Sequence, residues 1–520
     1  MAGKKHLLIY LSALCLSASS SLSAADWPTF AHDPQRTGWA SEESTLAVEN
    51  VWRLELKWSV HLKNEPHVLN GLTAPVAADD VTTTEGIKNV VYVAGSSDHV
   101  FALDAETGKP IWNRDLEGFG KPRSPDHWVC PQGITATPTI DKQRGIIFVI
   151  ASDGRVFGLD LGTGKTKYGP VQFVPPYSKN WSLNLVDETL YTSLSQGCAG
   201  AQNGIYSLNT RDPKRPMVRD LFLGGGIWGR GGPVAGDNGR VFGMTSDAPI
   251  NAAEGNFGSS VVAASLATLE VLDYYTPINW KFINRYDLDL ASGSPVWFRF
   301  KNYNLLAGGG KEGVVYLMDA DALGDKDHHT PLFVTPRLAN DQNSFEAKGI
   351  WGALSFWTDV DGQTWIYIPI WGPLSKMAPP FPKTNGPNPN GSIIAFKITQ
   401  SGPGQKPSME PGWISGDLSV PEPVVIANGV IFTLSTGEDV RQSHEGGVSP
   451  DGPTQLNNAE RVQRATHAVL YALDAKTGKV LYDSGNSMTT WVHFSGLAVA
   501  NGQIFAVDHS QLYCFGLKGE

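Results

Sequence analysis

The sequence predicts an all-β protein, folded as a single eight-bladed β-propeller. One short segment recurs along the chain, and each copy carries strand and turn signals. The composition agrees, because 56 Gly, 34 Pro and 16 Trp stand beside only 18% charged residues. Low charge with many turn formers argues against a coiled coil, and 41% hydrophobic residues argue against general disorder.

Three copies of the repeat are clear: Val90–Trp112, Ile146–Tyr168 and Leu470–Tyr482. The first two begin with alternating apolar residues, which predict a half-buried strand, and a hairpin turn rich in Ser, Asp or Gly then leads to a second strand. All three contain Asp-x-x-Thr-Gly-Lys, in which the Gly supplies the positive φ of a tight turn. An aromatic residue follows the Asp by eight positions in each copy, and we expect its ring to wedge between neighbouring sheets.

Weaker copies fill the intervals between the clear ones. They are Leu190–Thr210, Val241–Leu269, Leu305–Leu323, Trp365–Phe396 and Ile504–Phe515. Eight units of a few strands each fit the blades of a propeller better than a solenoid of shorter period. The strand-like Trp52–Val60 precedes the first unit without a hairpin of its own, and the last unit ends almost at the C-terminus. We expect this N-terminal strand to complete the last blade and close the ring, which removes an exposed sheet edge.

The first 25 residues predict a secretory signal peptide. A basic pair, Lys4 and Lys5, precedes an apolar run over residues 7–16, and small residues at 23–25 form a cleavage pattern. We therefore expect a periplasmic or secreted product in which residues 26–520 form the propeller.

The charge balance and the lack of a long apolar run limit the partners of the chain. With 41 Lys+Arg against 51 Asp+Glu, the formal charge is −10, which argues against a nucleic-acid partner because phosphate binding needs a basic surface. After the signal peptide, no stretch approaches the roughly 20 apolar residues of a membrane span. We expect no transmembrane segment.

Three cysteines remain after the predicted cleavage. Cys130 and Cys198 lie in Gly-rich loops, whereas Cys514 lies in the apparent strand Gln511–Leu517 and is expected to be buried. Export permits a disulfide, and one pair would leave one thiol over. We expect a Cys130–Cys198 bridge; the alternative is three small buried side chains.

The repeat Ala-Leu-Asp-Ala-x-Thr-Gly-Lys-x-x-Trp closely resembles the tryptophan-docking repeat of the quinoprotein alcohol dehydrogenase superfamily. Trp27–Gly38 also resembles the mature start of bacterial proteins with repeats named after pyrroloquinoline quinone (PQQ). The resemblance covers nearly the whole chain after residue 25 and implies an eight-bladed propeller. It is less specific for activity, since the superfamily includes propellers that bind no quinone, such as an outer-membrane assembly scaffold.

The catalytic branch of that superfamily suggests roles for several residues. Asp287 and Asp289 fall where that branch has its catalytic Trp-Asp-Tyr segment, so the resemblance implies Asp287 as general base and Asp289 as a ligand of Ca²⁺. Lys311, in the Gly-Gly-Gly-Lys-Glu-Gly run, matches the Lys that contacts the quinone. These assignments imply oxidation of an alcohol with PQQ and Ca²⁺ as cofactors.

Two further pairs complete the expected site. Asn251 or Asn256, after the strand 241–246, would replace the Asn that binds Ca²⁺ in the catalytic branch. Trp228 and Arg230 lie in a Gly-rich loop that suits close approach of a planar ligand. We expect both to contact PQQ.

The chain also departs from the catalytic pattern. It has no adjacent Cys pair, so the disulfide that covers the quinone in the catalytic branch is missing. Ser193–Gly204, where the Ca²⁺-binding Glu would stand, contains no acidic residue, although Ca²⁺ prefers several oxygen ligands with negative charge. No Cys-x-x-Cys-His is present to attach a haem, so electrons would leave through a separate carrier.

The sequence therefore leaves two alternative functions open. The first is an exported, PQQ-dependent oxidoreductase acting on an alcohol or sugar-like substrate, which the partial set of axial residues favours. The second is a propeller without cofactor that serves as a binding or assembly scaffold in the cell envelope. The missing Glu and the missing Cys pair favour this second function.

Overall fold

A computed structural model describes most of the chain after the predicted signal peptide. The described residues are 26–65, 71–117, 130, 133–212, 214–346, 348–439, 441, 444, 456 and 458–519. Residues 1–25, predicted as the signal peptide, lie outside the described residues.

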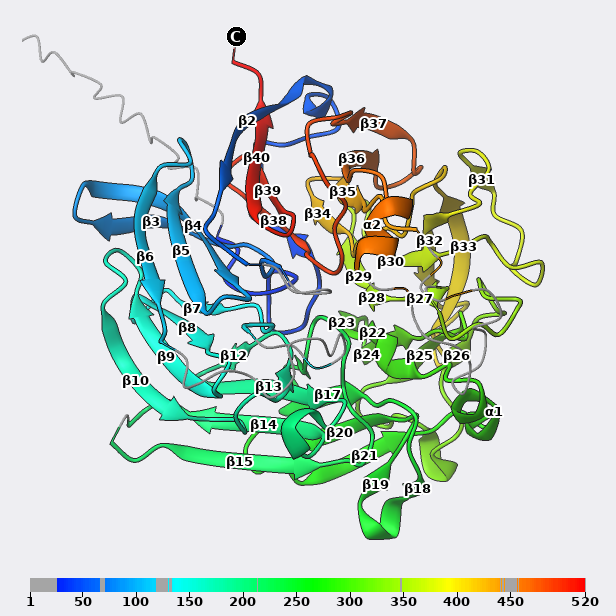
Figure 1. The fold of residues 1–520 in the computed structure, drawn as a ribbon. Coiled ribbons are helices and arrows are strands. Elements are labelled where there is room, and N and C mark those ends of the chain that lie inside the picture. The colour runs from blue at the N-terminus through cyan, green and yellow to red at the C-terminus, as the bar shows by residue number, and fades with distance from the viewer. Residues whose placement is uncertain are drawn as a thin grey trace, which may run out of the picture.

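Eight antiparallel sheets surround a central axis as the blades of a propeller (Figure 1). The strands of each blade are given from the axis outwards. Blade 1 consists of β3 (Val76–Thr83), β4 (Gly86–Gly95), β5 (His99–Asp104) and β6 (Pro110–Asp115), and blade 2 consists of β7 (Thr139–Asp141), β8 (Ile146–Ile150), β9 (Arg155–Asp160) and β10 (Thr166–Gln172). Blade 3 consists of β12 (Asn184–Val186), β13 (Thr189–Ser195), β14 (Gly204–Asn209) and β15 (Met217–Phe222), and blade 4 consists of β16 (Val234–Ala235), β17 (Arg240–Met244), β20 (Val261–Ser265) and β21 (Val271–Tyr275). Each predicted repeat unit falls in one blade.

Blades 5 to 8 continue the same pattern around the ring. Blade 5 consists of β23 (Val296–Phe300), β24 (Tyr303–Gly309), β25 (Val315–Asp319) and β26 (Phe333–Val334), and blade 6 consists of β29 (Ser355–Thr358), β30 (Thr364–Trp371), β32 (Gly391–Thr399) and β33 (Ser408–Ile414). Blade 7 consists of β34 (Val425–Ala427), β35 (Val430–Ser435), β36 (Val469–Asp474) and β37 (Val480–Asp483), and blade 8 consists of β38 (Leu497–Ala500), β39 (Gln503–Val507), β40 (Gln511–Leu517) and β2 (Leu54–His61).

The N-terminal strand closes the ring. β2 pairs antiparallel with the C-terminal strand β40, with Trp58 opposite Cys514, and so forms the outer strand of blade 8. This is the closure that the sequence predicted. Cys514 is buried with a free thiol, and burial raises the pKa of that thiol well above its ordinary value.

Short elements supplement the four main strands of each blade. The described residues include two α-helices, α1 (Trp280–Arg285) and α2 (Asn458–Arg464). Four short strands extend blade sheets: β1 (Trp39–Ala40) in blade 7, β11 (Lys179–Asn180) in blade 3, and β27 (Gly349–Ile350) and β31 (Lys383–Thr384) in blade 6. The others form two separate pairs, β18 (Ile250–Asn251) with β19 (Asn256–Phe257) and β22 (Gly293–Ser294) with β28 (Gly352–Ala353). Within the described ranges, no helix combines the length and the apolar character that crossing a bilayer requires.

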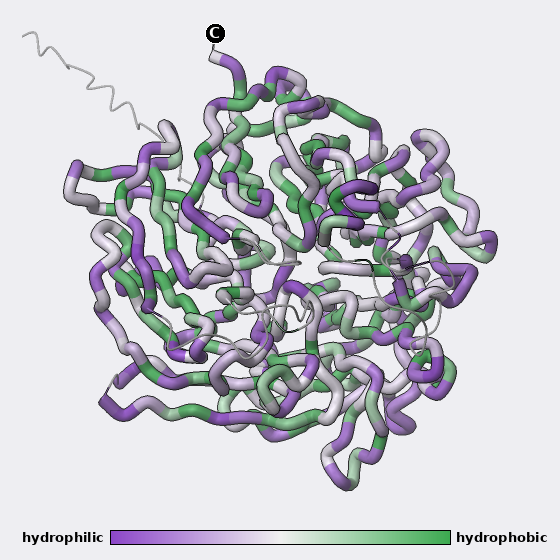
Figure 2. The backbone as a smooth tube through the Cα atoms, in the orientation of Figure 1, coloured by the Kyte–Doolittle hydropathy of each residue, from purple (hydrophilic) through white to green (hydrophobic). Residues whose placement is uncertain are grey.

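Hydrophobic side chains pack between neighbouring blades, and hydrophilic residues gather at the outer turns (Figure 2). Trp112 of blade 1 covers the turn of blade 2, where its indole N–H donates to the Leu161 carbonyl at 2.8 Å. A Cβ at Gly164 in that turn would lie 2.7 Å from the indole, and Gly164 has a φ of +66°. The turn glycine and the aromatic residue thus join adjacent blades, as the repeat predicted.

The segment before β2 runs along the inner strands of the ring. Residues 27–38 exchange hydrogen bonds with Ala77, Ile140, Asn184, Ala235, Trp297, Phe356 and Ile426, one residue from each of blades 1 to 7. Arg36 is fully buried there, and its guanidinium donates to the carbonyls of Gly231, Phe30 and Leu183. Burial lowers the pKa of Arg36 to about 9.

Candidate functional site

The candidate residues lie in loops at one end of the propeller. The loop before β16 holds Trp228 and Arg230, and the loop before β23 holds Asp287 and Asp289. Lys311 lies in the turn between β24 and β25 of blade 5. Because the strands of each blade alternate in direction, loops that enter an inner strand and turns between the two middle strands open on the same face.

Lys311 lies between two carboxylates. Its Nζ is 3.0 Å from Oδ1 of Asp287 and 3.1 Å from Oδ1 of Asp289. The side chains of Lys311 and Asp289 are 6% and 3% exposed, whereas that of Asp287 is 26% exposed. A Cβ at Gly310 would collide with the Asp289 carbonyl, so the Gly-rich run allows the lysine loop to lie directly against the aspartate loop.

A third carboxylate completes this group. Oxygens of Asp247, Asp287 and Asp289 lie within 4.8 Å of one another, and no other group of three or more His, Cys, Asp or Glu in the described part of the chain is arranged to hold a metal ion. Three carboxylates facing one ammonium leave an excess of two negative charges when all are ionised. That excess matches a divalent cation.

The electrostatics of this group follow from its burial. Burial raises the pKa of Asp287 to about 7, the nearby Asp289 and Asp247 add to the rise, and Lys311 opposes it. Burial also raises the pKa of Asp247. For Lys311, burial alone would lower the pKa, but the carboxylates of Asp289 and Asp287 raise it above the ordinary value. The lysine therefore stays protonated at neutral pH.

Tryptophan rings form a wall over the charged group. The indole N–H of Trp228 donates to Oδ2 of Asp289 at 2.9 Å, and Lys311 Nζ lies 5.2 Å from the centroid of the Trp228 ring. Trp351 lies edge-on to Trp228 at 5.2 Å and stacks on Trp371 at 4.8 Å, with an interplanar angle of 2°. Trp228, Trp351 and Trp371 belong to one buried cluster.

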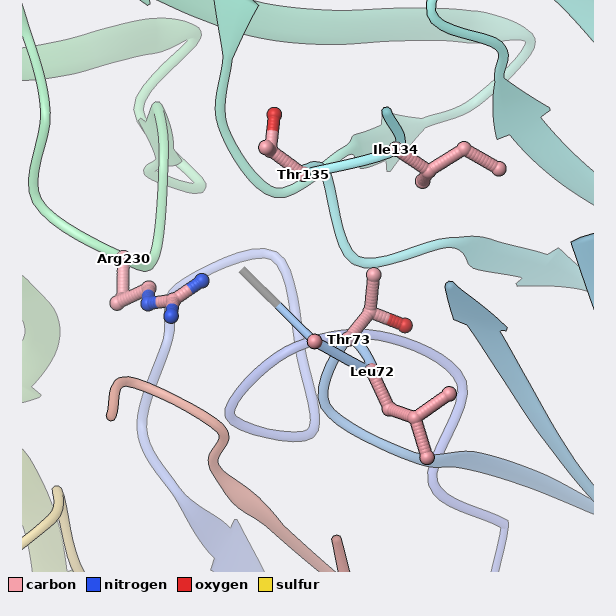
Figure 3. A pocket seen from close by; sticks show the side chains of 6 residues that line it. Leu72, Thr73, Ile134, Thr135 and Arg230 are labelled. Carbon is pink, nitrogen blue, oxygen red and sulfur yellow. The ribbon is translucent and has the colours of Figure 1, made fainter. Parts of the chain in front are cut away.

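Arg230 is two residues from Trp228 but lies apart from the carboxylates. Its Nη2 donates to the His493 carbonyl at 3.1 Å, and its guanidinium carbon is 4.8 Å from the centroid of the Phe494 ring. It lines a small cavity together with residues of the loops before blades 1 and 2 (Figure 3). The structure groups Trp228 with Lys311, and Arg230 faces the rings of Phe494 and Trp181, which belong to the same buried cluster as Trp228.

The predicted amide ligands form a hairpin of their own. Asn251 and Asn256 face each other in the pair β18–β19, and the Asn251 side chain is exposed. In the part of the chain that the structure describes, no hydrogen bond joins either amide to Asp287, Asp289 or Lys311. Asp247, which precedes this hairpin, brings a carboxylate to the group instead.

Sequence reasoning missed Asp247, Trp351 and Trp371. Asp247 follows the β17 strand closely, so an acidic residue after that strand was a usable signal. The two tryptophans stand in apolar runs, where nothing in the pattern separates a ring facing the axis from one packed between blades.

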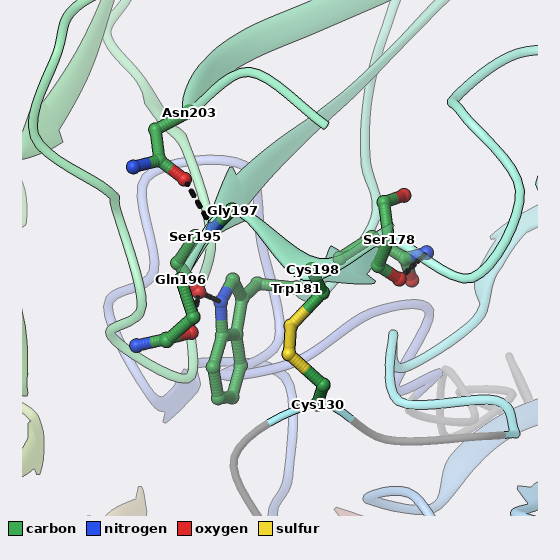
Figure 4. The surroundings of a disulfide bond; sticks show 9 residues. Cys130, Ser178, Trp181, Ser195, Gln196, Gly197, Cys198 and Asn203 are labelled. Atoms are coloured by element: carbon green, nitrogen blue, oxygen red, sulfur yellow. Dashed lines mark hydrogen bonds between the residues drawn. A yellow bond between two sulfur atoms is a disulfide. The ribbon is translucent and has the colours of Figure 1, made fainter. Parts of the chain in front are cut away.

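Cys130 and Cys198 form a disulfide, the pair expected from the sequence, with an S–S distance of 2.10 Å. It lies beside Trp181, whose indole N–H donates to Ser195 Oγ at 2.8 Å (Figure 4). The bridge ties the turn between β13 and β14 to the chain before blade 2.

Comparison with known proteins supports the repeat. Residues 27–170 match the family model described as "Glucose/ethanol/alcohol dehydrogenase, beta-propeller domain". The chain is 29% identical over 164 residues to the 1-butanol dehydrogenase (cytochrome c) of Thauera butanivorans, and 32% identical over 141 residues to the quinohemoprotein alcohol dehydrogenase of Comamonas testosteroni. These matches span 31% and 27% of this chain, but only 21% and 17% of the two relatives.

Solved structures resemble the whole ring. The crystal structure of the Comamonas testosteroni quinohemoprotein alcohol dehydrogenase covers 95% of this chain, with 81% of its own chain matched, a TM-score of 0.59 and 14% identity. A europium-containing methanol dehydrogenase also covers 95% of this chain, with 98% of its own chain matched, a TM-score of 0.58 and 14% identity. At such identities the likeness shows the fold alone.

Proposed function

This chain belongs to the PQQ-repeat (quinoprotein alcohol dehydrogenase-like) β-propeller family, and from that premise we propose an exported oxidoreductase that oxidises an alcohol or sugar-like substrate with PQQ. The group formed by Asp247, Asp287, Asp289 and Lys311 beneath the tryptophan wall carries this proposal. Relatives named as alcohol dehydrogenases, one of them with cytochrome c in its name, support the reaction class and a separate electron carrier.

The residues present fit a metal ion of the Ca²⁺ type. Three carboxylates lie within 4.8 Å of one another, and hard cations prefer such oxygen ligands. Oδ1 of Asp289 is shielded from solvent and lies 3.1 Å from Lys311 Nζ, and a carboxylate oxygen beside an ammonium keeps a second lone pair for a cation. Asp247 and Asp289 would hold the ion, while the predicted roles of Asn251 and Asn256 remain proposals.

The same residues fit a planar quinone. Trp228 offers an aromatic face that Asp289 fixes through the indole N–H, and Lys311 brings a positive charge to within 5.2 Å of that ring. Bound PQQ would supply the two-electron acceptor, and a divalent cation beside it would favour negative charge on nearby oxygens. The buried tryptophans would keep water from the reacting atoms.

Asp287 is the proposed general base. Its carboxylate is more exposed than that of Asp289, 26% against 3%, so a substrate hydroxyl can reach it. Lys311, at 3.0 Å, orients the carboxylate and favours its ionised form. Asp287 would take the hydroxyl proton as the alcohol carbon is oxidised.

The alternative is a scaffold without cofactor. Residues 193–204 contain no acidic residue, and the Cys130–Cys198 bridge is not the adjacent Cys pair of the catalytic branch. In that case Lys311 would only offset part of the negative charge of the carboxylates, and the loop face would bind another macromolecule.

Titration of the purified protein with PQQ in the presence of Ca²⁺ tests the proposal. We expect saturable absorbance changes at micromolar PQQ, followed by reduction of an artificial acceptor when alcohols are added. Lys311→Ala should abolish binding, whereas Lys476→Ala should not, because Lys476 bridges two carboxylates at the outer surface. Absence of any spectral change at millimolar Ca²⁺ would favour the scaffold.

A further inference from the structure

The short helix α1 carries an asparagine, Asn284, close to the carboxylate group of the candidate site. The chain leaves the outer strand β21 of blade 4, forms α1 and passes Asp287 before it enters the inner strand β23 of blade 5 (Figure 1). Asn284 is half-buried and lies in the last turn of α1, three residues before Asp287. Its position allows one residue to contact two loops of the site.

The side chain of Asn284 binds the loop of Asp247 through both of its polar atoms. Its Nδ2 donates to the carbonyl of Ala248, the residue after Asp247, at 2.9 Å. Its Oδ1 accepts a hydrogen bond from the hydroxyl of the fully buried Ser259. The backbone N–H of Ser259 in turn donates to the carbonyl of Ser246, the residue before Asp247, at 2.8 Å. One amide therefore holds both neighbours of Asp247, the first directly and the second through a serine.

The backbone of Asn284 contacts the loop of Asp287. Its carbonyl accepts the backbone N–H of Tyr286, at the end of α1, and that of Asp287 at 3.4 Å. Asp287 has a φ of +52°, a left-handed conformation that residues other than glycine keep only where their surroundings specify it. Asn284 is therefore a direct connection between the loop of Asp287 and the loop of Asp247.

The Asp247 carboxylate needs such a connection. Its side chain is exposed, and no side chain among the described residues donates a hydrogen bond to it. It nevertheless lies within 4.8 Å of the carboxylates of Asp287 and Asp289. Like charges at this distance repel when no cation is bound, so a free carboxylate would turn away. The contacts of its neighbours must hold it in place.

A second attachment of the same loop does not involve α1. The backbone N–H of Ser246 donates to the Gly226 carbonyl at 2.8 Å, and the Ser246 hydroxyl accepts the N–H of Gly226 at 2.9 Å. These bonds fix the loop to the segment that carries Trp228. Loss of the Asn284 side chain should therefore release Ala248 and Asp247 while Ser246 stays attached.

We propose that Asn284 is a positioning residue that holds Asp247 against Asp287 and Asp289, so that the three carboxylates are assembled before a cation binds. Such preorganisation raises affinity, because the ligands are ordered and brought together during folding and not at the moment of binding. The inference rests on the cation site of the proposed function and concerns how that site is built.

Calorimetric titration of the purified protein with Ca²⁺ tests this role. We expect Asn284→Ala to weaken Ca²⁺ binding at least tenfold, as Asp247→Asn should, because either change removes the third carboxylate from the site. In the double variant, the loss should equal that of Asp247→Asn alone, since Asn284 acts through Asp247. No loss in Asn284→Ala, or a loss that adds to that of Asp247→Asn, would overturn the proposal.

Asn50 provides a matched control outside the site. It is also half-buried, its Nδ2 donates to the Thr45 carbonyl at 2.7 Å, and its Oδ1 accepts the N–H of Ala47 at 2.9 Å. Its carbonyl accepts the N–H of Arg53, three residues further on, as that of Asn284 does from Asp287. Asn50→Ala should lower the melting temperature without changing Ca²⁺ affinity. An equal loss of affinity in both alanine variants would show an effect of general stability and contradict the proposal.

Ser259→Ala tests the same role with a smaller change, should Asn284→Ala fail to fold. It removes only the hydroxyl that orients the Asn284 amide. We expect Ca²⁺ binding about fivefold weaker than in the parent, the effect of one neutral hydrogen bond. Unchanged affinity in this variant would also count against Asn284.

Thermal unfolding with EDTA at about pH 8, where the carboxylates are ionised, tests the role without a metal. Asp247→Asn removes one of three like charges, so it should raise the melting temperature of the parent. The rise should be smaller in the Asn284→Ala background, because Asp247 can there move away from the other two carboxylates. Equal rises would show that Asn284 does not hold Asp247.

The two measurements separate failure of this inference from failure of the proposed function. Ca²⁺ binding by the parent that Asn284→Ala leaves unchanged would refute the role of Asn284 and retain the cation site. A parent that binds no Ca²⁺ would refute the cation site. The unfolding experiment then decides the role of Asn284: unequal rises support it, and equal rises overturn it.

Discussion

Replacing Lys311 by Met should destabilise the metal-free protein far more than a comparable change at the surface. The ammonium lies 3.0 and 3.1 Å from two carboxylates, and each contact is worth roughly 5 kcal/mol at an effective dielectric constant of about 20, before desolvation is subtracted. Removing one partner of a buried ion pair costs about 3–5 kcal/mol in practice. Because Asp287 and Asp247 can take up protons, we expect the lower value, about 3 kcal/mol.

Urea unfolding with EDTA, and again with Ca²⁺, measures this effect. Lys476 is the matched control, since it also bridges two carboxylates, at 3.2 and 2.6 Å, but its side chain is 40% exposed. Lys476→Met should cost no more than about 1 kcal/mol. Ca²⁺ should stabilise Lys311→Met more than the parent, because the ion replaces the lost positive charge among three carboxylates.

Two results would refute this reasoning. Equal losses for Lys311→Met and Lys476→Met would show that the carboxylates around Lys311 are not desolvated. A large loss in Lys311→Met without any added stabilisation by Ca²⁺ would show that the three carboxylates do not form a metal site.

Three more outcomes can be measured. Gly164→Ala should lower the free energy of unfolding in urea by about 2–4 kcal/mol, because the alanine would be strained at a positive φ and would collide with the Trp112 ring. Gly239, at a φ of +76°, has open space around it, so Gly239→Ala should show only the backbone strain, about 1–2 kcal/mol. Equal losses in the two variants would contradict the collision. Asp247→Asn should weaken Ca²⁺ binding at least tenfold by calorimetry, and unchanged affinity would remove Asp247 from the site. Burial, followed by the charge of Arg230, lowers the pKa of Lys179 to about 7, so the folded chain releases this proton near pH 7 while the unfolded chain holds it to about pH 10. The contribution of this group to stability should therefore rise between pH 7 and 10, and urea unfolding of Lys179→Met should lack that part of the rise; identical pH profiles of parent and variant would contradict the lowered pKa.

The fold could be predicted because its physics is local and repeated. Asp-x-x-Thr-Gly-Lys specifies a turn whose glycine has a positive φ, and Trp112, eight positions after Asp104, packs on the next such turn. Closure by β2 could be predicted because the strand-like Trp52–Val60 has no hairpin of its own near the N-terminus, and the last repeat unit, Ile504–Phe515, ends almost at the C-terminus.

The site was less accessible to sequence reasoning. Lys311 and Asp287 could be singled out from a resemblance, but their distance depends on Gly310 lying against the Asp289 carbonyl, a contact between two loops. Arg230 follows Trp228 by two residues, yet it faces Phe494 and Trp181 and not the carboxylates. Lys179 lies in no motif, and only its burial without an ion-pair partner among the described residues draws attention to it.

Residues 27–38 give the ring a property that a chain of repeats would lack. In an open array, each unit contacts only its neighbours, so end units can unfold first while the rest stays folded. Here one extended segment shares hydrogen bonds with the inner strands of seven blades, and the following strand β2 completes the eighth. Opening any of these seven blades therefore breaks contacts with a segment that the other six also hold, and opening the eighth detaches the strand that follows this segment. The eight blades should melt as one cooperative unit, which keeps the loops that carry Asp287, Lys311 and Arg230 in fixed positions relative to one another.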